Sequence, residues 1–327
     1  MLESKPHFSS VIQTSATAYG IAYTRSRFTL LTKPDRNYLL QAATGVLMER
    51  LFFNLSKKLG CTQIIECGAH DAITSQKFVD ANSGKALAIE ANPFVHAKFK
   101  AQYLNSNIDY RSIGLAKAPA ILEMNIPSHH TNESSLEGSL KRRDDFKDYR
   151  TIEVIVDTLD NISGNFANSS ATVLWIDVEG LGGEVLEGAH NVLSNPNVKL
   201  IYIEVQEDSA YYSDELNALQ ISERLSYFDF IPIARDYPAS NLYNLLFVKA
   251  PCLDLCSTEL SSFWIDYTNL RVPYIRLRSP RDLLSLLKKS LLSQNKATKP
   301  SWLDYLFSLA GSKSSKQQIT DWNSIQK

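Results

Sequence analysis

Long apolar runs and an excess of charge of either sign are both missing from this 327-residue sequence. No run approaches the ~18 apolar residues that a membrane-spanning helix needs, and residues 1–30 do not join a basic start to an apolar core of signal-peptide length. Lysine and arginine total 34 against 35 aspartates and glutamates. Because binding to nucleic acid depends largely on neutralising phosphates, this balance argues against a nucleic-acid partner. A cytoplasmic location is the default expectation.

Cysteine and histidine are scarce, with four and six residues respectively. Cys252 and Cys256 form a C-x-x-x-C pair without a second pair or nearby histidines, so a zinc site is not indicated. Cys61 and Cys67 bracket an apolar run that is typical of a buried strand. We therefore expect four ordinary thiols and assign no metal ligand.

Glycine is missing where a dinucleotide-binding turn would need it. The apolar run 63–67 leads into Gly68-Ala69-His70-Asp71, and a second run, 85–89, ends at Glu90. A strand, a glycine turn, a helix and a second strand ending in an acid is typical of nucleotide-binding α/β folds. Ala72 stands where a further glycine would let a pyrophosphate approach. A phosphate-free nucleoside cofactor, such as the methyl donor S-adenosylmethionine, needs only the one glycine.

Two acidic residues follow another apolar run further along the chain. The run begins at Thr172 and stops at Asp177 and Glu179, and a glycine turn and helical spacing come next. Parallel sheets bind ligands at the carboxyl ends of their strands. The two carboxylates therefore indicate a ligand site, although an acid pair can also simply cap the helix that starts near Gly182.

Six blocks of sequence occur in a familiar order. They are Glu66-Cys67-Gly68-Ala69-His70-Asp71, Ala88-Ile89-Glu90-Ala91-Asn92-Pro93, Asn132-Glu133-Ser134-Ser135-Leu136, Val156-Asp157-Thr158-Leu159-Asp160, Leu174 to Ala189, and Tyr202-Ile203-Glu204-Val205 with Tyr211 and Tyr212. In this order they resemble the FkbM-type S-adenosylmethionine-dependent methyltransferases over roughly residues 61 to 250. Six ordered blocks are far more specific than any one of them.

The chain departs from the pattern of that family at a few positions. His70 and Ala72 replace the usual Asn and Gly of the turn, and Ala91 replaces a Pro. Gly182 stands where an acid commonly follows Glu-Gly-Ala. These departures motivate the non-catalytic alternative given below.

The resemblance implies a Rossmann-like class I methyltransferase fold. This is an α/β fold with a mostly parallel seven-stranded sheet, an antiparallel last strand and helices on both faces. The residue pattern agrees, because strands expected near 63–67, 85–90, 108–112, 172–177 and 198–205 alternate with helices expected near 74–82, 93–106, 182–194 and 213–226. Two further β-like runs cover 120–126 and 151–156, and a final pair, 228–234 and 242–248, is close enough to form a hairpin.

Three parts of the chain are expected. Residues 1–60 form an N-terminal extension with one amphipathic helix, residues 61–250 the methyltransferase domain, and residues 251–327 a basic, partly helical C-terminal extension. The N-terminal helix should run from Pro34 to Lys58 and end at Gly60, and we expect it to pack against the sheet edge or cover the cofactor pocket. Leucines at 283, 284, 287 and 291 predict a helix face that docks on the domain or makes weak contact with a membrane surface.

The resemblance also implies where S-adenosylmethionine binds. Glu66, Gly68, Ala69 and His70 surround its amino-acid end, Glu66 through the ammonium. Glu90, followed by Ala91, takes the ribose hydroxyls, and Ser112 and Ile113 border the adenine. Ser134 or Ser135, in a long loop typical of lids, touches the cofactor carboxylate or the substrate.

Methyl transfer to a hydroxyl needs an acceptor oxygen in line with the methyl carbon and a group that takes its proton. Asp177 and Glu179 are the candidates for acceptor positioning or general base, and Asp177 is also placed near the cofactor. Glu204 is a candidate for substrate contact, with an edge salt bridge as its alternative. Tyr211 and Tyr212 are candidates to stack on a sugar ring or to fill the core.

The sequence therefore predicts an S-adenosylmethionine-dependent O-methyltransferase acting on a hydroxyl of a saccharide or a secondary metabolite. The carboxylates, the paired tyrosines and the basic tail favour the saccharide. The alternative is a non-catalytic module that keeps the fold and binds the cofactor or a partner protein without turnover. A nicotinamide-dependent oxidoreductase would need the phosphate-binding turn that this sequence lacks.

Overall fold

The computed structural model describes residues 33–127, 138–142, 148–164, 166, 170–207, 212, 215–237 and 241–269. The chain divides into two compact units. The first comprises residues 1–49, 236–240 and 262–327, and the second comprises residues 50–235 and 241–261.

The described part of the first unit contains the start of helix α3 (Lys33–Lys58) and the end of helix α10 (Ser257–Asn269). Leu40, Ala43 and Leu47 of α3 are buried, as the helical spacing predicts. The backbone N–H of Tyr237 donates to Thr44 Oγ1 at 2.8 Å. This hydrogen bond joins the backbone at Tyr237 to α3.

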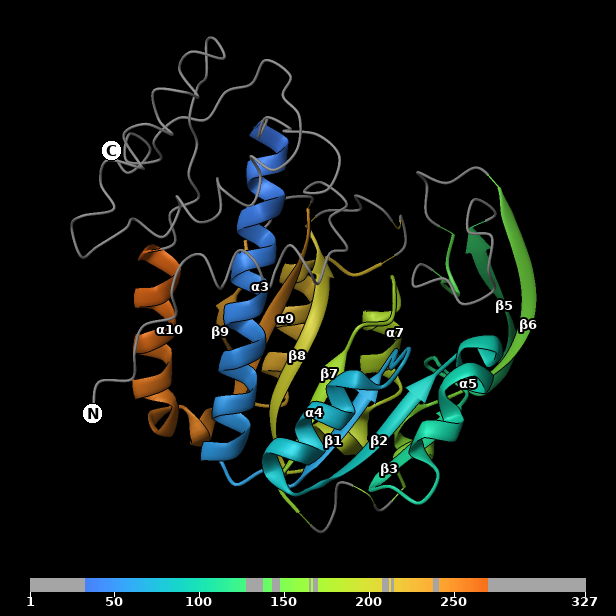
Figure 1. Cartoon of the computed structure of the whole chain (residues 1–327), viewed down its shortest axis with the longest axis horizontal. Coiled ribbons are helices and arrows are strands. Elements are labelled where there is room, and N and C mark those ends of the chain that lie inside the picture. Colours follow the sequence, from blue (N-terminus) through green and yellow to red (C-terminus); the bar gives the residue numbers. More distant parts are fainter. Residues whose placement is uncertain are drawn as a thin grey trace, which may run out of the picture. The chain divides into compact units, whose positions relative to one another are not determined.

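A seven-stranded sheet with the order β3-β2-β1-β7-β8-β10-β9 forms the centre of the second unit (Figure 1). Its strands are β1 (Gln63–Cys67), β2 (Lys85–Glu90), β3 (Ile108–Ser112), β7 (Thr172–Ile176), β8 (Val198–Gln206), β9 (Phe230–Arg235) and β10 (Leu242–Lys249). The first five pair in parallel, whereas β10 runs antiparallel to both β8 and β9. This order confirms the predicted mostly parallel sheet with an antiparallel last strand.

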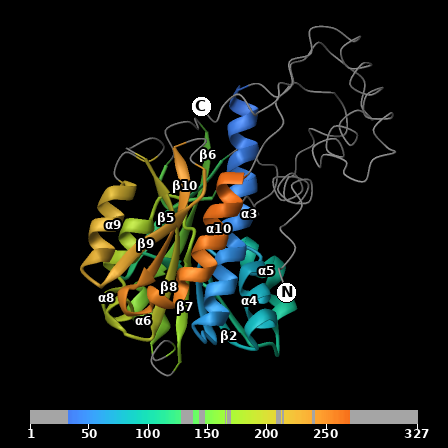
Figure 2. The same ribbon diagram turned by 90° about the vertical axis from the view of Figure 1, so that its left-hand side faces the viewer.

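Helices cover both faces of this sheet (Figure 2). One face carries α4 (Ile73–Asn82) and α5 (Pro93–Phe99) with its 3₁₀ extension η1 (Lys100–Tyr103). The other face carries α6 (Leu159–Ser163), α7 (Gly182–Glu187), α8 (His190–Ser194) and α9 (Ala218–Ser226). On that second face, Leu174 and Ile201 of the strands join Val185, Leu193 and Ile221 of the helices in one buried cluster. Burial of these apolar faces holds the layers together.

The second half of α3 lies on the face of the central strands. Phe52 packs edge-on against Trp175 of β7 and Tyr202 of β8, with centroid distances of 5.2 and 5.9 Å. Trp175 and Tyr202 are register partners and stack at 3.7 Å. The expectation that this helix packs against the sheet edge is therefore wrong. Gly60, with φ of +66°, follows its end as predicted.

Helix α5 ends earlier than the predicted helix 93–106. It becomes a 3₁₀ turn after Phe99, and this tighter turn ends at Tyr103, whose hydroxyl donates to the backbone carbonyl of Asp71. The predicted helix 213–226 begins only at Ala218, because Asn217 and Gln220 form a capping box there.

The predicted helix 182–194 is two helices, α7 and α8. At Gly188 the backbone lies so close to the Ala116 carbonyl oxygen that a Cβ would come within 2.5 Å of it. The Asp160 carboxylate then accepts the backbone N–H groups of Asn191 and Val192 at 3.0 and 2.9 Å. These contacts break the first helix and begin the second.

The β-like runs predicted at 120–126 and 151–156 form strands of a separate three-stranded sheet. Here β5 (Ala120–Pro127) pairs antiparallel with β6 (Tyr149–Asp157), and β4 (Gly114–Leu115) pairs on the other side of β6. Figure 1 shows β5 and β6 beside α5. Met124, Val154 and Val156 build a small core of their own.

Other predictions fall on residues outside the described ranges, namely Ser134, Ser135, Tyr211 and the leucines at 283–291. The three-part division of the chain stays a prediction. The four cysteines are buried and do not form disulfides. None of the helices in the described ranges combines the length and the apolar content of a membrane span.

Candidate active site

The turn after β1 contains the one glycine that the sequence singled out. Gly68 has φ of +80°, and a Cβ there would lie 1.8 Å from the backbone oxygen of Asp177. The backbone N–H of Asp177 also donates to the Cys67 carbonyl at 2.9 Å. Glycine is therefore required at this position by the neighbouring loop after β7, since any side chain would push the two strand ends apart.

The altered residues of this turn adopt the left-handed conformation. His70 has φ of 46° and Ala72 has φ of 55°, a region that costs L-residues roughly 1 kcal/mol each. The hydroxyl of Tyr110 donates to the His70 carbonyl, and the hydroxyl of Tyr103 donates to the Asp71 carbonyl. Two phenols thus hold the turn from outside.

Glu90 fixes the same turn from the pocket side. Its carboxylate accepts the backbone N–H groups of His70 and Asn92, both at 2.7 Å. The side chain is 7% exposed, and burial raises its pKa although the two N–H groups act in the opposite direction. Carboxylate oxygens have several lone pairs, so Glu90 keeps capacity for the hydroxyls of a ligand.

Glu66 faces away from the pocket. It is 3% exposed, and its Oε2 accepts both the backbone N–H and the hydroxyl of Ser75 in α4, at 2.9 and 2.5 Å. Burial raises its pKa to about 7, against the hydrogen bonds from Ser75. This carboxylate is therefore engaged by the first turn of α4 and does not line the pocket described below, and its contact with the cofactor ammonium stays a prediction.

Three carboxylates converge where β7 and β8 end. One oxygen each from Asp177, Glu179 and Glu204 lies within 4.8 Å of the others. Burial raises the pKa of Asp177 to about 6. Glu179 has φ of 47°, and its Oε2 accepts the Tyr212 hydroxyl at 3.1 Å. The three acids that the sequence proposed separately thus lie together in space.

The alternative that the acids cap α7 is wrong. The residue before α7, Leu181, makes no side-chain cap, and the backbone N–H of Gly183 donates instead to Glu215 Oε1 at 2.7 Å. That oxygen also lies 3.6 Å from the place of a Cβ on Gly182. Glu215, from the loop before α9, thus brings a carboxylate to the position where the sequence lacks one.

Residues 138–142 lie against the acidic loop. The Ser139 hydroxyl donates to the Glu179 carbonyl, and Lys141 Nζ lies 3.1 Å from Glu215 Oε2 and 3.8 Å from Glu184 Oε1. The long loop predicted as a lid therefore contributes at least these residues to the site.

Tyr212 is 2% exposed and packs under Gly180, where a Cβ would lie 2.6 Å from its ring. Its ring fills the core, which excludes stacking of Tyr212 on a sugar. Its hydroxyl instead orients Glu179.

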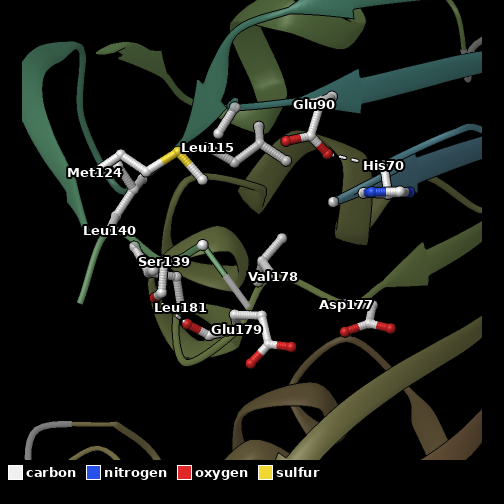
Figure 3. A pocket seen from close by; sticks show the side chains of 13 residues that line it. His70, Glu90, Leu115, Met124, Ser139, Leu140, Asp177, Val178, Glu179 and Leu181 are labelled. Carbon is white, nitrogen blue, oxygen red and sulfur yellow. Dashed lines mark hydrogen bonds between the residues drawn. The ribbon is translucent and has the colours of Figure 1, made fainter. Parts of the chain in front are cut away.

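These elements enclose a pocket of about 560 Å³, counting the open space at its mouth. Figure 3 shows Glu90 and His70 on one side, Asp177 and Glu179 on another, and Met124 and Leu140 on a third. Its lining residues are Gly68, His70, Glu90, Ala91, Leu115, Met124, Gly138, Ser139, Leu140, Asp177, Val178, Glu179 and Leu181.

Six of the predicted site residues line this pocket, namely Gly68, His70, Glu90, Ala91, Asp177 and Glu179, whereas Glu204 does not. Four predicted cofactor residues, Glu66, Ala69, Ser112 and Ile113, do not. Ser112 is exposed at the end of β3, and Ile113 packs against the core cluster. The residues that the sequence did not reveal are mainly apolar ones from β4, β5 and the 138–140 segment, and no pattern in the sequence marks them.

The charge of the lining selects among cofactors. Glu90, Asp177 and Glu179 line the pocket, and among the described residues it has no lysine or arginine in its wall. Such a wall repels a pyrophosphate and attracts a cation. S-adenosylmethionine, with a sulfonium, an ammonium and no phosphate, fits this wall.

Comparison with solved structures finds methyltransferases at low similarity. Magnesium protoporphyrin IX methyltransferase from Synechocystis PCC 6803, with bound SAM, is 10% identical with a TM-score of 0.37, covering 76% of this chain and 99% of its own. The 1,6-didemethyltoxoflavin-N1-methyltransferase of Burkholderia thailandensis is 13% identical with a TM-score of 0.32, and the match covers 76% of this chain and 90% of that enzyme. Comparison with curated proteins finds no sequence match.

The family comparison is more specific. The model of the family described as "Methyltransferase FkbM domain" matches residues 66–231, about half of the chain. The match begins at Glu66 of the glycine turn and ends in β9, so it includes the pocket. The chain therefore belongs to the FkbM methyltransferase family, whose cofactor is S-adenosylmethionine.

Proposed function

We propose that this methyltransferase transfers the methyl group to a hydroxyl of a saccharide. The observation that carries the proposal is the convergence of Asp177, Glu179 and Glu204 within 4.8 Å at the edge of the pocket. Neighbouring carboxylates suit an acceptor with neighbouring hydroxyls, because each ionised oxygen accepts strong hydrogen bonds.

S-adenosylmethionine, when bound, supplies a methyl group on a positively charged sulfur. Glu90 would hold its ribose hydroxyls, and Ala91 and Leu115 offer apolar surface beside Glu90 for its base. The carboxylates of Asp177 and Glu179 favour its positive charges. The turn at Gly68 lies next to Asp177, so the cofactor side and the acid side of the pocket share one wall.

Asp177 is the group best suited to take the proton of the acceptor hydroxyl. Its pKa of about 6 leaves it mostly ionised at neutral pH, yet makes it a stronger base than an ordinary aspartate. In the described residues no hydrogen bond to its carboxylate competes for this role. Glu179 and Glu204 would accept the neighbouring hydroxyls of the acceptor and orient the reacting one.

Methyl transfer from isotope-labelled S-adenosylmethionine to a panel of monosaccharides and glycosides tests this function. Matched amines and carboxylic acids should be included, and the product analysed by mass spectrometry for the site of the added methyl. We expect an O-methyl product that is lost with Asp177→Asn and kept with Glu123→Gln, an exposed acid on β5. Methylation confined to amines would overturn the acceptor class, and cofactor binding without transfer to any acceptor would favour the non-catalytic module.

A further inference from the structure

A second pocket lies at the opposite end of the sheet from the acidic one. It encloses about 830 Å³, counting the open space at its mouth, and is formed by the start of β8, the turn between α9 and β9, the end of β10 and the 3₁₀ turn η3 (Ala250–Cys252). Lys199 is the second residue of β8, and Lys249 is the last residue of antiparallel β10. Neither lysine takes part in the proposed methyl transfer.

Lys249 is a buried cation. It is 8% exposed, its Nζ donates to the Leu193 carbonyl at 2.7 Å, and it lies 4.3 Å from the centroid of the Phe230 ring. Both contacts offer only partial negative charge. Within the described ranges, no carboxylate lies within 4.0 Å of this ammonium. Burial of a cation without a charged partner is costly, so the site favours an added anion.

Lys199 adds a second positive charge to the same wall. Its Nζ donates to the Pro196 carbonyl at 2.7 Å, which leaves further donors available. Asp229 is the acidic residue of the lining. Burial lowers the pKa of Lys249, and the charge of Lys199 lowers it further. The charge of Asp229 raises the same pKa. Two ammonium groups thus face one carboxylate, and one positive charge is not compensated within the lining.

Aromatic side chains flank the two lysines. Tyr227 is 84% exposed at the pocket, and the adjacent Phe228 is half-buried, with its ring 5.3 Å from the ring of His190. A large aromatic side chain left this open offers surface for the apolar part of a ligand.

We infer that this pocket binds a small organic anion, with its carboxylate or phosphate on Lys199 and Lys249 and its apolar body against Tyr227 and Phe228. The site is separate from the acidic pocket, and its occupancy does not depend on the cofactor. Carboxylate and phosphate share the chemistry that the lysines recognise, and the probes below distinguish them.

The test is calorimetric titration of benzoate, phenyl phosphate and the neutral isostere benzamide into the full chain saturated with S-adenosylhomocysteine. We expect benzoate or phenyl phosphate to bind and benzamide not to bind. The tighter of the two anions identifies the preferred head group. Lys199→Met should weaken binding by about tenfold or more, because a charged hydrogen bond is lost. The control Lys85→Met, at an exposed residue that begins β2, should bind as the parent does.

A second measurement tests Lys249 directly, without a substitution at this buried residue. Acetylation of Lys249 in the unmodified chain by acetic anhydride, followed by mass spectrometry, should be slowed severalfold by the bound anion, whereas acetylation of Lys85 should not change. Equal binding of benzoate and benzamide, unchanged affinity in Lys199→Met, or unprotected Lys249 would each overturn the inference.

Discussion

Two adjacent loops at the carboxyl ends of β1 and β7 use similar residues in opposite ways. The turn 68–72 is held through its backbone by side chains from elsewhere: Glu90 accepts the N–H of His70, Tyr103 donates to the carbonyl of Asp71, and Tyr110 donates to the carbonyl of His70. In the loop 177–181, Asp177 and Glu179 line the pocket, and their carboxylates converge with that of Glu204. The first loop is a fixed support, and the second presents reactive groups.

The backbone explains why these loops can sit side by side. Each contains a left-handed non-glycine residue: His70 lies two residues from left-handed Gly68 and Ala72, and Glu179 is followed by left-handed Gly180. Such residues cost of order 1–3 kcal/mol and persist where surrounding contacts hold them. The contacts come from β2, β3 and η1 for the turn, and from Ser139 and Tyr212 for the acidic loop. The comparison predicts that substitutions in the two loops affect different kinetic constants.

The largest effect is expected from Asp177→Asn. Loss of a general base should lower kcat by about 10²–10⁴-fold, while the affinity for S-adenosylhomocysteine stays within about twofold, because this product lacks the sulfonium charge that Asp177 favours and the amide keeps the shape of the side chain. Steady-state kinetics and calorimetry on the same preparation measure both. An unchanged kcat would remove Asp177 from the proton transfer.

Glu90→Ala should change the affinity for the cofactor rather than kcat. Removing a carboxylate that holds the turn and faces the pocket should weaken cofactor affinity by about 10–100-fold, the range of a lost hydrogen bond to a charged group. At saturating cofactor, kcat should fall much less. A fall in kcat with unchanged cofactor affinity would contradict the division between the two loops.

The pH dependence follows from the raised pKa of Asp177. Activity should rise as pH passes through about 6, where Asp177 ionises, and this rise should be absent from the residual activity of Asp177→Asn. For stability the sign is opposite. In the native state the Asp177 carboxyl keeps its proton up to about pH 6, whereas in the unfolded chain it loses the proton near the ordinary pKa of 3.8. The free energy of unfolding therefore falls as pH rises between these two values.

Thermal unfolding checks the predicted effect of pH on stability. Asp177→Asn should melt at about the same temperature as the parent chain near pH 3.8 and a few degrees above it at pH 8. A variant that melts lower than the parent at pH 8 would show that the carboxylate stabilises the fold.

Tyr110→Phe is expected to have a moderate effect. The phenol acts on the turn and not on the reacting atoms, so the KM for the cofactor should rise severalfold with kcat nearly unchanged, and stability should fall by about 1 kcal/mol. Tyr227→Phe, at an exposed tyrosine far from the turn, is the matched control. A proportional fall in kcat would mean that Tyr110 acts on the acidic loop as well.

The smallest effect is expected from Ala72→Gly. Glycine adopts φ of 55° without penalty, so the substitution should stabilise the chain by about 0.5 kcal/mol, after the greater entropy of unfolded glycine is subtracted. Chemical denaturation measures this change. Destabilisation would mean that the buried methyl group of Ala72 contributes more than the backbone strain costs.

The sequence predicted the elements that local pattern determines and missed those that depend on distant contacts. Strands β1, β2 and β3 match the predicted bounds because each is a short apolar or alternating run that ends at a polar turn. The break in helix 182–194 depends on Asp160 and Ala116, which lie far away in sequence. The capping box at Asn217 and Gln220, in contrast, was available from spacing alone.

The same distinction holds in the site. Glu90, Asp177 and Glu179 were predicted because they follow strands whose ends meet at one edge of the sheet. Glu66 lies near the end of β1 and so fits this pattern too. Its carboxylate instead accepts a hydrogen bond from the Ser75 hydroxyl, because α4 begins shortly after β1 in the chain. The pocket wall from Met124 and Leu140 comes from a second sheet, whose position no local pattern determines.

The central claim is that the turn 68–72 binds the cofactor and the loop 177–181 acts on the acceptor. Calorimetric titration of S-adenosylhomocysteine into the parent chain, Glu90→Ala and Asp177→Asn tests it most directly. We predict micromolar binding to the parent chain and to Asp177→Asn, and strongly weakened binding to Glu90→Ala. Binding that survives in Glu90→Ala but is lost in Asp177→Asn would contradict the assignment, and no binding to the parent chain would contradict the account as a whole.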